Sequence, residues 1–249
     1  MRLLVSVRSA LEVAPAVAGG ADIIDAKEPA HGSLGPVSPQ ELRRIVSQLP
    51  PGMPLSVALG DPGDAAGVIA DIDQLGRGSS QRECYVKLGS AGHRGAAPRV
   101  LARAVAAAAR TALAPRVVAV AYADSARADA LDRFEVLRMA SEAGAHGVLL
   151  DTYIKDGIDL FGHADPGAVA EWSAAARQRG LLVAIAGSLS ARAISPLDLP
   201  ADIVGVRGAV CEGGREGTVS EALVRRIKSA LTSSPTAIPL PDPPSVMVL

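Results

Sequence analysis

Short apolar runs recur along the chain, and each is followed by a segment with helical features. Continuous apolar runs are typical of strands that are buried on both faces, as in a parallel sheet. Eight strand–helix repeats within roughly 230 residues predict an α/β protein, a TIM (β/α)8 barrel that forms a single domain. The runs cover residues 3–7, 22–26, 55–59, 84–88, 117–121, 147–151, 181–186 and 202–206.

An open, doubly wound sheet is the alternative architecture. It would usually have fewer strands and a glycine-rich dinucleotide turn early in the chain. No GxGxxG follows the first apolar run, which favours the barrel.

Helix-start signals support the intervening helices. A Ser or Thr followed three residues later by Glu forms a capping box, which satisfies free N–H groups of the first turn. We also expect helices over residues 99–113 and 171–179, and a short one over 191–194. The capping boxes are Ser9 with Glu12, Ser38 with Glu41 and Thr218 with Glu221.

The barrel is expected to occupy residues 1–231. Residues 232–249 contain five prolines and show no hydrophobic period. Such a composition is typical of an extended or flexible tail.

Composition excludes several functions. The net charge is −1 and aromatic residues make up 2%, so neither a basic field nor a stacking platform is available for nucleic acid. No apolar stretch reaches the roughly 18 residues of a membrane span, and the N-terminus lacks signal-peptide features. Cys84 and Cys211 form no CxxC pair, which argues against a disulfide framework or a zinc site. We expect a cytoplasmic homo-oligomer that takes a small molecule.

The lysines have an unusual distribution. Only four of the 25 basic residues are lysine, and the rest are arginine. Lys27 ends the second run, Lys87 ends the fourth, and Lys155 follows the sixth, whereas Lys228 is expected on the solvated face of a helix. Chemistry in a TIM barrel takes place at the carboxyl ends of the strands. Three of the four lysines are therefore expected at the barrel mouth.

A buried lysine can lose its proton and act as a nucleophile, which arginine cannot do. Three converging ammonium groups would lower one another's pKa. Asp25 shares a strand face with Lys27, and Asp151 lies four residues before Lys155. These carboxylates are candidates for proton transfer, although salt bridges that close the barrel rim are an alternative interpretation.

Glycines after the last two runs predict a phosphate site. Gly187 and Ser188 follow the seventh run, and Arg207 and Gly208 follow the eighth. Loops at these positions commonly bind phosphate in TIM barrels, because glycine lets backbone N–H groups approach the anion. Arg207 would add a bidentate contact, while an ordinary tight turn is the alternative.

Four further residues are weaker candidates for substrate binding or catalysis. Arg8 follows the first run and either binds a second phosphate or caps a helix, and Ser33 lies in a glycine loop that is expected to close over the substrate. His31 is either an acid or an exposed loop residue. Asp124 is either catalytic or a helix N-cap. The other histidines lack metal-ligand spacing, so no metal is expected.

Together these residues predict a phosphate-binding barrel with an amine nucleophile, a combination that is typical of class I aldolases. Five motifs then resemble one family, the 4-(hydroxymethyl)-2-furancarboxaldehyde phosphate synthases, also called (5-formylfuran-3-yl)methyl phosphate synthases. The likeness runs from residue 2 to about residue 230. The motifs are GGADIIDAKEPAHGSLG, YVKLG, LLDTYIKDG, AIAGSL and DIVGVRGAVC.

The resemblance implies a TIM barrel that condenses two molecules of glyceraldehyde 3-phosphate into a furan aldehyde phosphate, a precursor of methanofuran in one-carbon metabolism. It implies a lyase that needs no metal or other cofactor. It assigns the Schiff base to Lys27 and the proton acceptor to Lys87, and it makes Asp25 the acidic partner of Lys27. Lys155 and Asp151 match further catalytic positions.

In this chemistry one triose phosphate becomes the nucleophile and the second offers an aldehyde. Addition, loss of one phosphate, dehydration and ring closure then give the furan. Another Schiff-base aldolase, a phosphosugar isomerase, and a non-catalytic barrel that binds a phosphometabolite remain alternatives.

Overall fold

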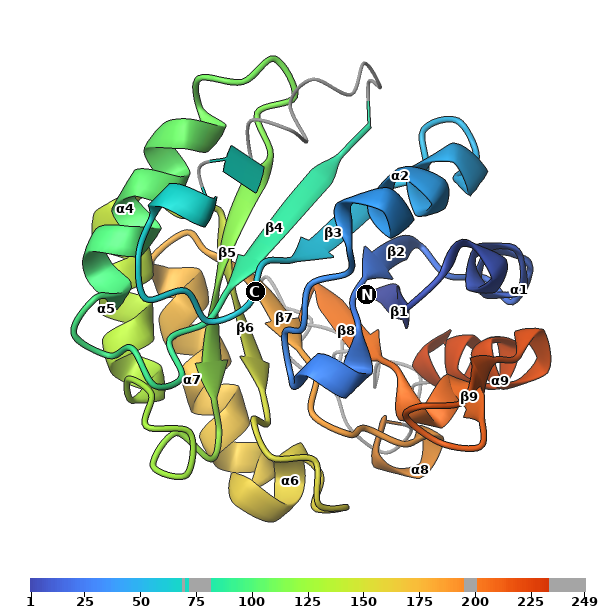
Figure 1. Cartoon of the computed structure of the whole chain (residues 1–249). Coiled ribbons are helices and arrows are strands. Elements are labelled where there is room, and N and C mark those ends of the chain that lie inside the picture. The colour runs from blue at the N-terminus through green and yellow to red at the C-terminus, as the bar shows by residue number, and fades with distance from the viewer. Residues whose placement is uncertain (69, 72–81, 195–200, 233–249) are drawn as a thin grey trace, which may run out of the picture.

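Eight parallel strands close into a barrel, as predicted (Figure 1). Each strand pairs with its neighbours in chain order, and β8 pairs with β1 to complete the ring. The computed structural model describes residues 1–68, 70–71, 82–194 and 201–232. The barrel strands are β1 (Arg2–Val7), β2 (Ile23–Ala26), β3 (Leu55–Ala58), β4 (Cys84–Leu88), β5 (Arg116–Tyr122), β6 (Gly147–Asp151), β7 (Leu182–Ile185) and β8 (Ile203–Val206).

The helices surround this ring (Figure 1). A small antiparallel hairpin of β9 (Cys211–Glu212) and β10 (Thr218–Val219) follows β8. The α-helices are α1 (Val13–Ala18), α2 (Pro39–Gln48), α4 (Ala97–Ala108), α5 (Arg133–Ala143), α6 (Leu160–His163), α7 (Pro166–Gln178), α8 (Ala191–Ile194) and α9 (Glu221–Thr232). The 3-10 turns are η1 (Ala10–Glu12), η2 (Pro29–His31) and η3 (Gly208–Val210).

Of the three expected capping boxes, only the Ser38 N-cap is confirmed, because the Glu41 carboxylate accepts a hydrogen bond from the Ala10 N–H instead of closing the box. The Ser38 hydroxyl accepts a hydrogen bond from the backbone N–H of Glu41 at 3.1 Å. The prediction for Ser9 and Glu12 is wrong, because Ser9 makes no side-chain cap bond and Glu12 is buried and engaged elsewhere. The prediction for Thr218 is also wrong, because this residue lies in β10.

The expected helices differ in extent. The prediction over 191–194 matches α8, whereas α4 ends at Ala108 and α7 begins at Pro166. Thr232, the first residue of the predicted tail, is the last residue of α9. The rest of that tail lies outside the described residues.

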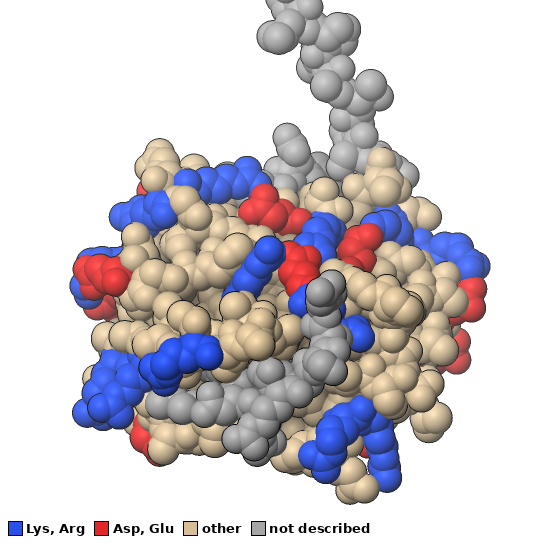
Figure 2. Space-filling model, turned by 90° about the horizontal axis from the view of Figure 1, so that it is seen from above, with Lys and Arg blue, Asp and Glu red and all other residues tan. Residues whose placement is uncertain are grey.

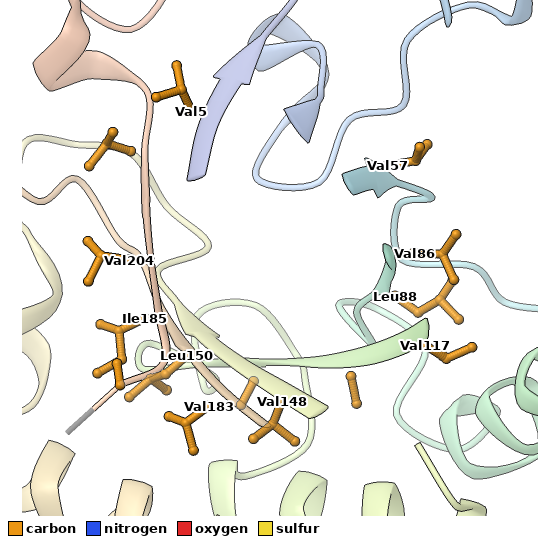
Figure 3. Packing of buried hydrophobic residues seen from close by; sticks show 14 of the residues in the cluster. Val5, Val57, Val86, Leu88, Val117, Val148, Leu150, Val183, Ile185 and Val204 are labelled. Carbon is orange, nitrogen blue, oxygen red and sulfur yellow. The ribbon is translucent and has the colours of Figure 1, made fainter. Parts of the chain in front are cut away.

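Buried hydrophobic side chains form two clusters, because alternate strand residues point to opposite faces. The larger cluster fills the layer between strands and helices, where Val5, Val57, Val148 and Val204 point away from the barrel axis (Figure 3). The smaller cluster lines the barrel interior. Residues from all eight strands leave a cavity in that interior.

Figure 2 shows one face of the molecule, on which both basic and acidic side chains lie among other residues. Among the helices of the described residues, none has the length and apolar character needed to cross a membrane.

The single tryptophan provides a test of the outer core. Trp172 of α7 is fully buried, and its indole N–H donates to the Arg133 carbonyl at 3.1 Å. We expect Trp172→Ala to lower the free energy of unfolding by about 3–5 kcal/mol, because it leaves a large cavity in the outer core. Urea denaturation followed by circular dichroism measures this. Leu11→Ala is the control, since Leu11 is 87% exposed and its truncation should change stability by less than about 0.5 kcal/mol. Equal losses in both variants would contradict the packing role.

Candidate active site

A cavity of about 250 Å³ opens at the carboxyl ends of the barrel strands. It is lined by the three lysines that were predicted to converge, Lys27, Lys87 and Lys155, and by the carboxylates Asp25 and Asp151. All of these except Lys155 are less than 9% exposed. Lys228, by contrast, lies on α9, where its ammonium group is partly buried against Asp22 at 2.5 Å rather than fully solvated.

The first charge pair joins Asp25 of β2 to Lys87 of β4, two strands that are separated by β3. Lys87 Nζ lies 2.7 Å from Asp25 Oδ1, and the Ser6 hydroxyl donates to Asp25 Oδ2 at 2.7 Å. Burial by itself raises the pKa of Asp25, but Lys87, Lys27 and the Ser6 hydroxyl together outweigh it, so the pKa is lowered. Asp25 is therefore held as a carboxylate.

The second charge pair lies at the end of β6. Lys155 Nζ donates to Asp151 Oδ1 at 2.8 Å and to Thr152 Oγ1 at 2.9 Å. The Ser33 hydroxyl donates to Asp151 Oδ2 at 3.1 Å. Burial opposes the charge of Asp151, yet Lys155 and Lys27 hold its pKa well below the ordinary value.

Lys27 differs from the other two lysines. Its amine has no hydrogen-bond or ion-pair partner among the described residues. Burial lowers the pKa of Lys27 to about 7, and the ammonium groups of Lys87 and Lys155 act in the same direction. Asp151 and Asp25 oppose the shift without cancelling it. A substantial neutral fraction near pH 7 makes Lys27 the amine that is best prepared for nucleophilic attack.

Asp25 and Lys27 share the cavity face, as predicted, but they form no ion pair. Residues two apart along a strand are separated by about 7 Å, whereas Lys87 reaches Asp25 from β4. The expectation that Asp25 is the direct partner of Lys27 is therefore corrected.

The predicted phosphate loops face the same cavity, which is lined by Gly187, Ser188 and Gly208. Gly187 and Ser188 have positive φ angles, +108° and +54°, so the chain turns sharply after β7. The backbone N–H groups of Ser188, Leu189 and Gly208 have no backbone acceptor among the described residues. Such N–H groups are available to an anion.

Arg207 does not have its predicted role. Its side chain is 2% exposed, and its five N–H groups are engaged by protein oxygens. The acceptors are the Glu12 carboxylate and the carbonyls of Ser6, Arg215 and Gly217. No donor is left for a substrate phosphate, so Arg207 is a structural residue of the rim.

Two further predicted ligands lie outside the cavity lining. Arg8 is paired with Glu28, Nη2 to Oε1 at 2.9 Å, and also donates to the Glu216 carbonyl. Ser33 is buried behind Asp151, so it positions that carboxylate. Both side chains are therefore engaged by protein groups instead of lining the cavity.

The structure also shows the surroundings of Asp124 and His31, for which the sequence left two interpretations each. Asp124 accepts hydrogen bonds from the backbone N–H groups of Tyr153 (2.6 Å) and Ile154 (2.9 Å), so it shapes the loop before Lys155 and caps no helix of its own. His31 is exposed on η2. Among the described residues, no cluster of His, Cys, Asp and Glu could hold a metal ion.

Comparison with known proteins identifies the family. The sequence model of the 4-HFC-P synthases matches residues 3–228. The chain belongs to the 4-HFC-P synthase family.

Relatives of this family member include (5-formylfuran-3-yl)methyl phosphate synthase of Methanothermobacter thermautotrophicus, which is 37% identical over 94% of this chain and 100% of the relative. The enzyme with that name from Archaeoglobus fulgidus is also 37% identical, over 93% of this chain and 99% of the relative.

Solved structures with a similar fold include phosphoribosylanthranilate isomerase of Thermotoga maritima, with a TM-score of 0.60, 16% identity and coverage of 93% of this chain and 98% of that one. KGPDC of Streptococcus mutans also has a TM-score of 0.60, with 13% identity and coverage of 93% and 97%. At these identities the likeness concerns the fold alone.

Three cavity residues of this 4-HFC-P synthase family member escaped sequence reasoning. Ser6 lies on β1 and holds Asp25, and Ser56 on β3 is fully buried with no partner for its hydroxyl among the described residues. Arg215 lies in the hairpin after β8. Single serines in apolar strands carry no distinctive pattern, but the arginine in GGREG could have been flagged by its flanking glycines and its position after the last strand.

The charge state of Lys27 has a measurable pH dependence. An amine-selective acylating reagent should modify Lys27 with a midpoint near pH 7, because only the neutral amine reacts, and peptide mass mapping measures this. Asp151→Asn should move the midpoint down, since that carboxylate raises the pKa. The folded chain releases this proton at lower pH than the unfolded chain, so the stability contribution of Lys27 should rise from about pH 7 to 10.5. A midpoint above pH 9 would contradict this environment.

The structural role of Arg207 is tested by Arg207→Met. We expect the free energy of unfolding to fall by about 3–5 kcal/mol, because the buried Glu12 carboxylate loses its partner. Urea denaturation measures the loss, and adding the change Glu12→Gln should restore part of the stability. Unchanged stability with weaker substrate binding would instead support the original phosphate-ligand prediction.

Proposed function

We propose that this chain condenses two molecules of glyceraldehyde 3-phosphate into (5-formylfuran-3-yl)methyl phosphate through a Schiff base on Lys27. The names of its relatives support the product. The observation that carries the mechanism is the buried, unpartnered amine of Lys27 between two carboxylate–ammonium pairs. The family resemblance places the product in the formation of methanofuran.

The product structure determines which atoms must join. Its phosphate is on the methylene group at ring carbon 3, and its formyl group is on ring carbon 5. One triose therefore keeps its phosphate and becomes the phosphomethyl group, ring carbon 3 and ring carbon 2. The other triose loses its phosphate and supplies the formyl carbon and ring carbons 5 and 4. The new bond joins C3 of the triose that loses phosphate to C2 of the triose that retains it.

Lys27 activates the triose that loses phosphate. Its neutral amine adds to the C1 aldehyde, water leaves, and the iminium makes the C2 proton acidic. Removal of that proton places an electron pair on C2, which expels phosphate from C3. The enol that results is nucleophilic at C3. An amine nucleophile is required at this step, because the iminium is the electron sink.

The two ion pairs supply the proton transfers. In its ion pair with Asp25, Lys87 is an ammonium group, so it first donates a proton to the departing hydroxyl and then, as a neutral amine, accepts the C2 proton. Lys155, held by Asp151 and Thr152, protonates the departing phosphate. Both carboxylates keep these amines in position throughout.

The second triose reacts as a ketone. Its C2 must be a carbonyl, so a proton first moves from C2 to C1, and the aldehyde expected from sequence reasoning is replaced by its ketone isomer. The C3 enol adds to that ketone, and the C1 hydroxyl of the second triose closes onto C2 of the first. Loss of two waters gives the aromatic furan, and hydrolysis of the imine releases it. The balance is one phosphate and two waters per product.

Borohydride trapping tests the imine. With glyceraldehyde 3-phosphate present, reduction should add a triose-derived mass to the peptide that contains Lys27, and glyceraldehyde 3-phosphate alone should yield near-ultraviolet furan absorbance. Lys27→Arg should abolish both signals, because it keeps the charge without a neutral amine. Lys228→Arg is the matched control on α9 and should keep both.

Each contrary outcome has a defined meaning. An adduct on another lysine, or an active Lys27→Arg variant, contradicts the assignment. Trapping without furan absorbance would indicate a different Schiff-base aldolase, and phosphate binding without trapping would indicate a non-catalytic barrel.

A further inference from the structure

Arg215 lies in the hairpin between β9 and β10, in a turn whose backbone is held by two other arginines. Arg207 donates to the carbonyl oxygens of Arg215 at 3.0 Å and Gly217 at 2.7 Å, and Arg8 donates to that of Glu216 at 3.0 Å. Three consecutive carbonyls are thus held by guanidinium groups, so the turn has a defined position at the cavity rim.

Glycine permits this turn. A Cβ atom on Gly217 would lie 1.8 Å from the carbonyl oxygen of Glu212, so a side chain there would force the turn apart. Gly208 lies against Arg215, because a Cβ on Gly208 would lie within 3.8 Å of the Arg215 backbone and Cβ. The free N–H of Gly208 and the side chain of Arg215 therefore belong to the same part of the rim.

The three arginines of this region differ in their charge partners. Arg207 is neutralised by Glu12 and Arg8 by Glu28. Arg215 has no salt bridge to any described carboxylate, although it is only partly exposed and lines the cavity. Burial lowers the pKa of its guanidinium, but an arginine remains protonated at neutral pH. The cavity therefore contains a cation that no described carboxylate contacts directly, although Asp151, Glu216 and Glu28 attract it from farther away.

The Arg215 guanidinium also has N–H donors without an acceptor among the described residues. Nη2 donates to the Gly32 carbonyl at 2.7 Å and lies 3.4 Å from that of Pro29. No acceptor for Nε or Nη1 is present among the described residues. The Nη2 side of the guanidinium is thus held by the loop after β2. The N–H groups of Nε and Nη1 are free to bind an anion in a planar, bidentate manner.

We propose that Arg215, in place of Arg207, supplies the side-chain cation of the phosphate site and binds a substrate phosphate together with the backbone N–H groups of Ser188, Leu189 and Gly208. The inference rests on the proposed use of triose phosphates. The proposal also assigns a role to the β9–β10 hairpin. Arg215 contacts the loop that follows Lys27, so a phosphate bound to Arg215 would hold the hairpin and that loop together.

Binding of inorganic phosphate tests the proposal without turnover. Isothermal titration of the full chain should show that Arg215→Gln weakens phosphate binding by about 10- to 100-fold, as expected for lost hydrogen bonds to a charged group. Glu216→Gln, in the same turn, should bind phosphate as the wild type does. Wild-type affinity in Arg215→Gln, or no phosphate binding by the wild type, overturns the proposal.

A second measurement separates a ligand from a structural role. Borohydride trapping on Lys27 is compared for glyceraldehyde 3-phosphate and unphosphorylated glyceraldehyde. Arg215→Gln should lose most of the wild-type preference for the phosphorylated aldehyde while trapping glyceraldehyde normally. Loss of both would mean that the hairpin only maintains the site, and would overturn the proposal. If the wild type traps neither aldehyde, the proposed function fails, whereas the phosphate titration still decides the role of Arg215.

Discussion

The charge balance inside the barrel mouth is the constraint on which the site depends. Three amines share a buried cavity with two carboxylates, and each carboxylate is paired with one amine. The remaining amine, that of Lys27, has no counter-charge in direct contact, so burial favours its neutral form. A third carboxylate would hold Lys27 as an ammonium group and remove its nucleophilicity. The number of carboxylates is therefore as important as the number of lysines.

A similar balance operates on the rim, with arginine in place of lysine. Two guanidinium groups, those of Arg207 and Arg8, are matched by glutamates and serve as scaffold. Arg215 has no such match and faces the cavity. On the rim the two paired guanidinium groups hold the structure, whereas Arg215 has no carboxylate in direct contact. This pattern follows from the high cost of burying a charge without a partner, which a bound dianion would relieve.

Much of the fold followed from local patterns. The runs at 84–88 and 147–151 coincide with β4 and β6, because strands that are buried on both faces must be apolar throughout. The capping box expected at Ser9 failed for a different reason. Glu12 has a stronger partner in Arg207, 195 residues away, and no local pattern contains that information. Ser56 was missed because a single serine in an apolar strand carries no distinctive pattern.

Local sequence patterns were enough to predict the barrel, the family and the convergence of three lysines, because strand ends meet at one mouth whenever the sheet closes in chain order. Which charges pair with one another depends on the three-dimensional fold. Asp25 lies close to Lys27 in the sequence but is bonded to Lys87, and Arg207 is bonded to Glu12 rather than free for phosphate. The physical reason is distance. A charge interacts with whichever partner lies within a few ångströms, and in a barrel that partner comes from another strand.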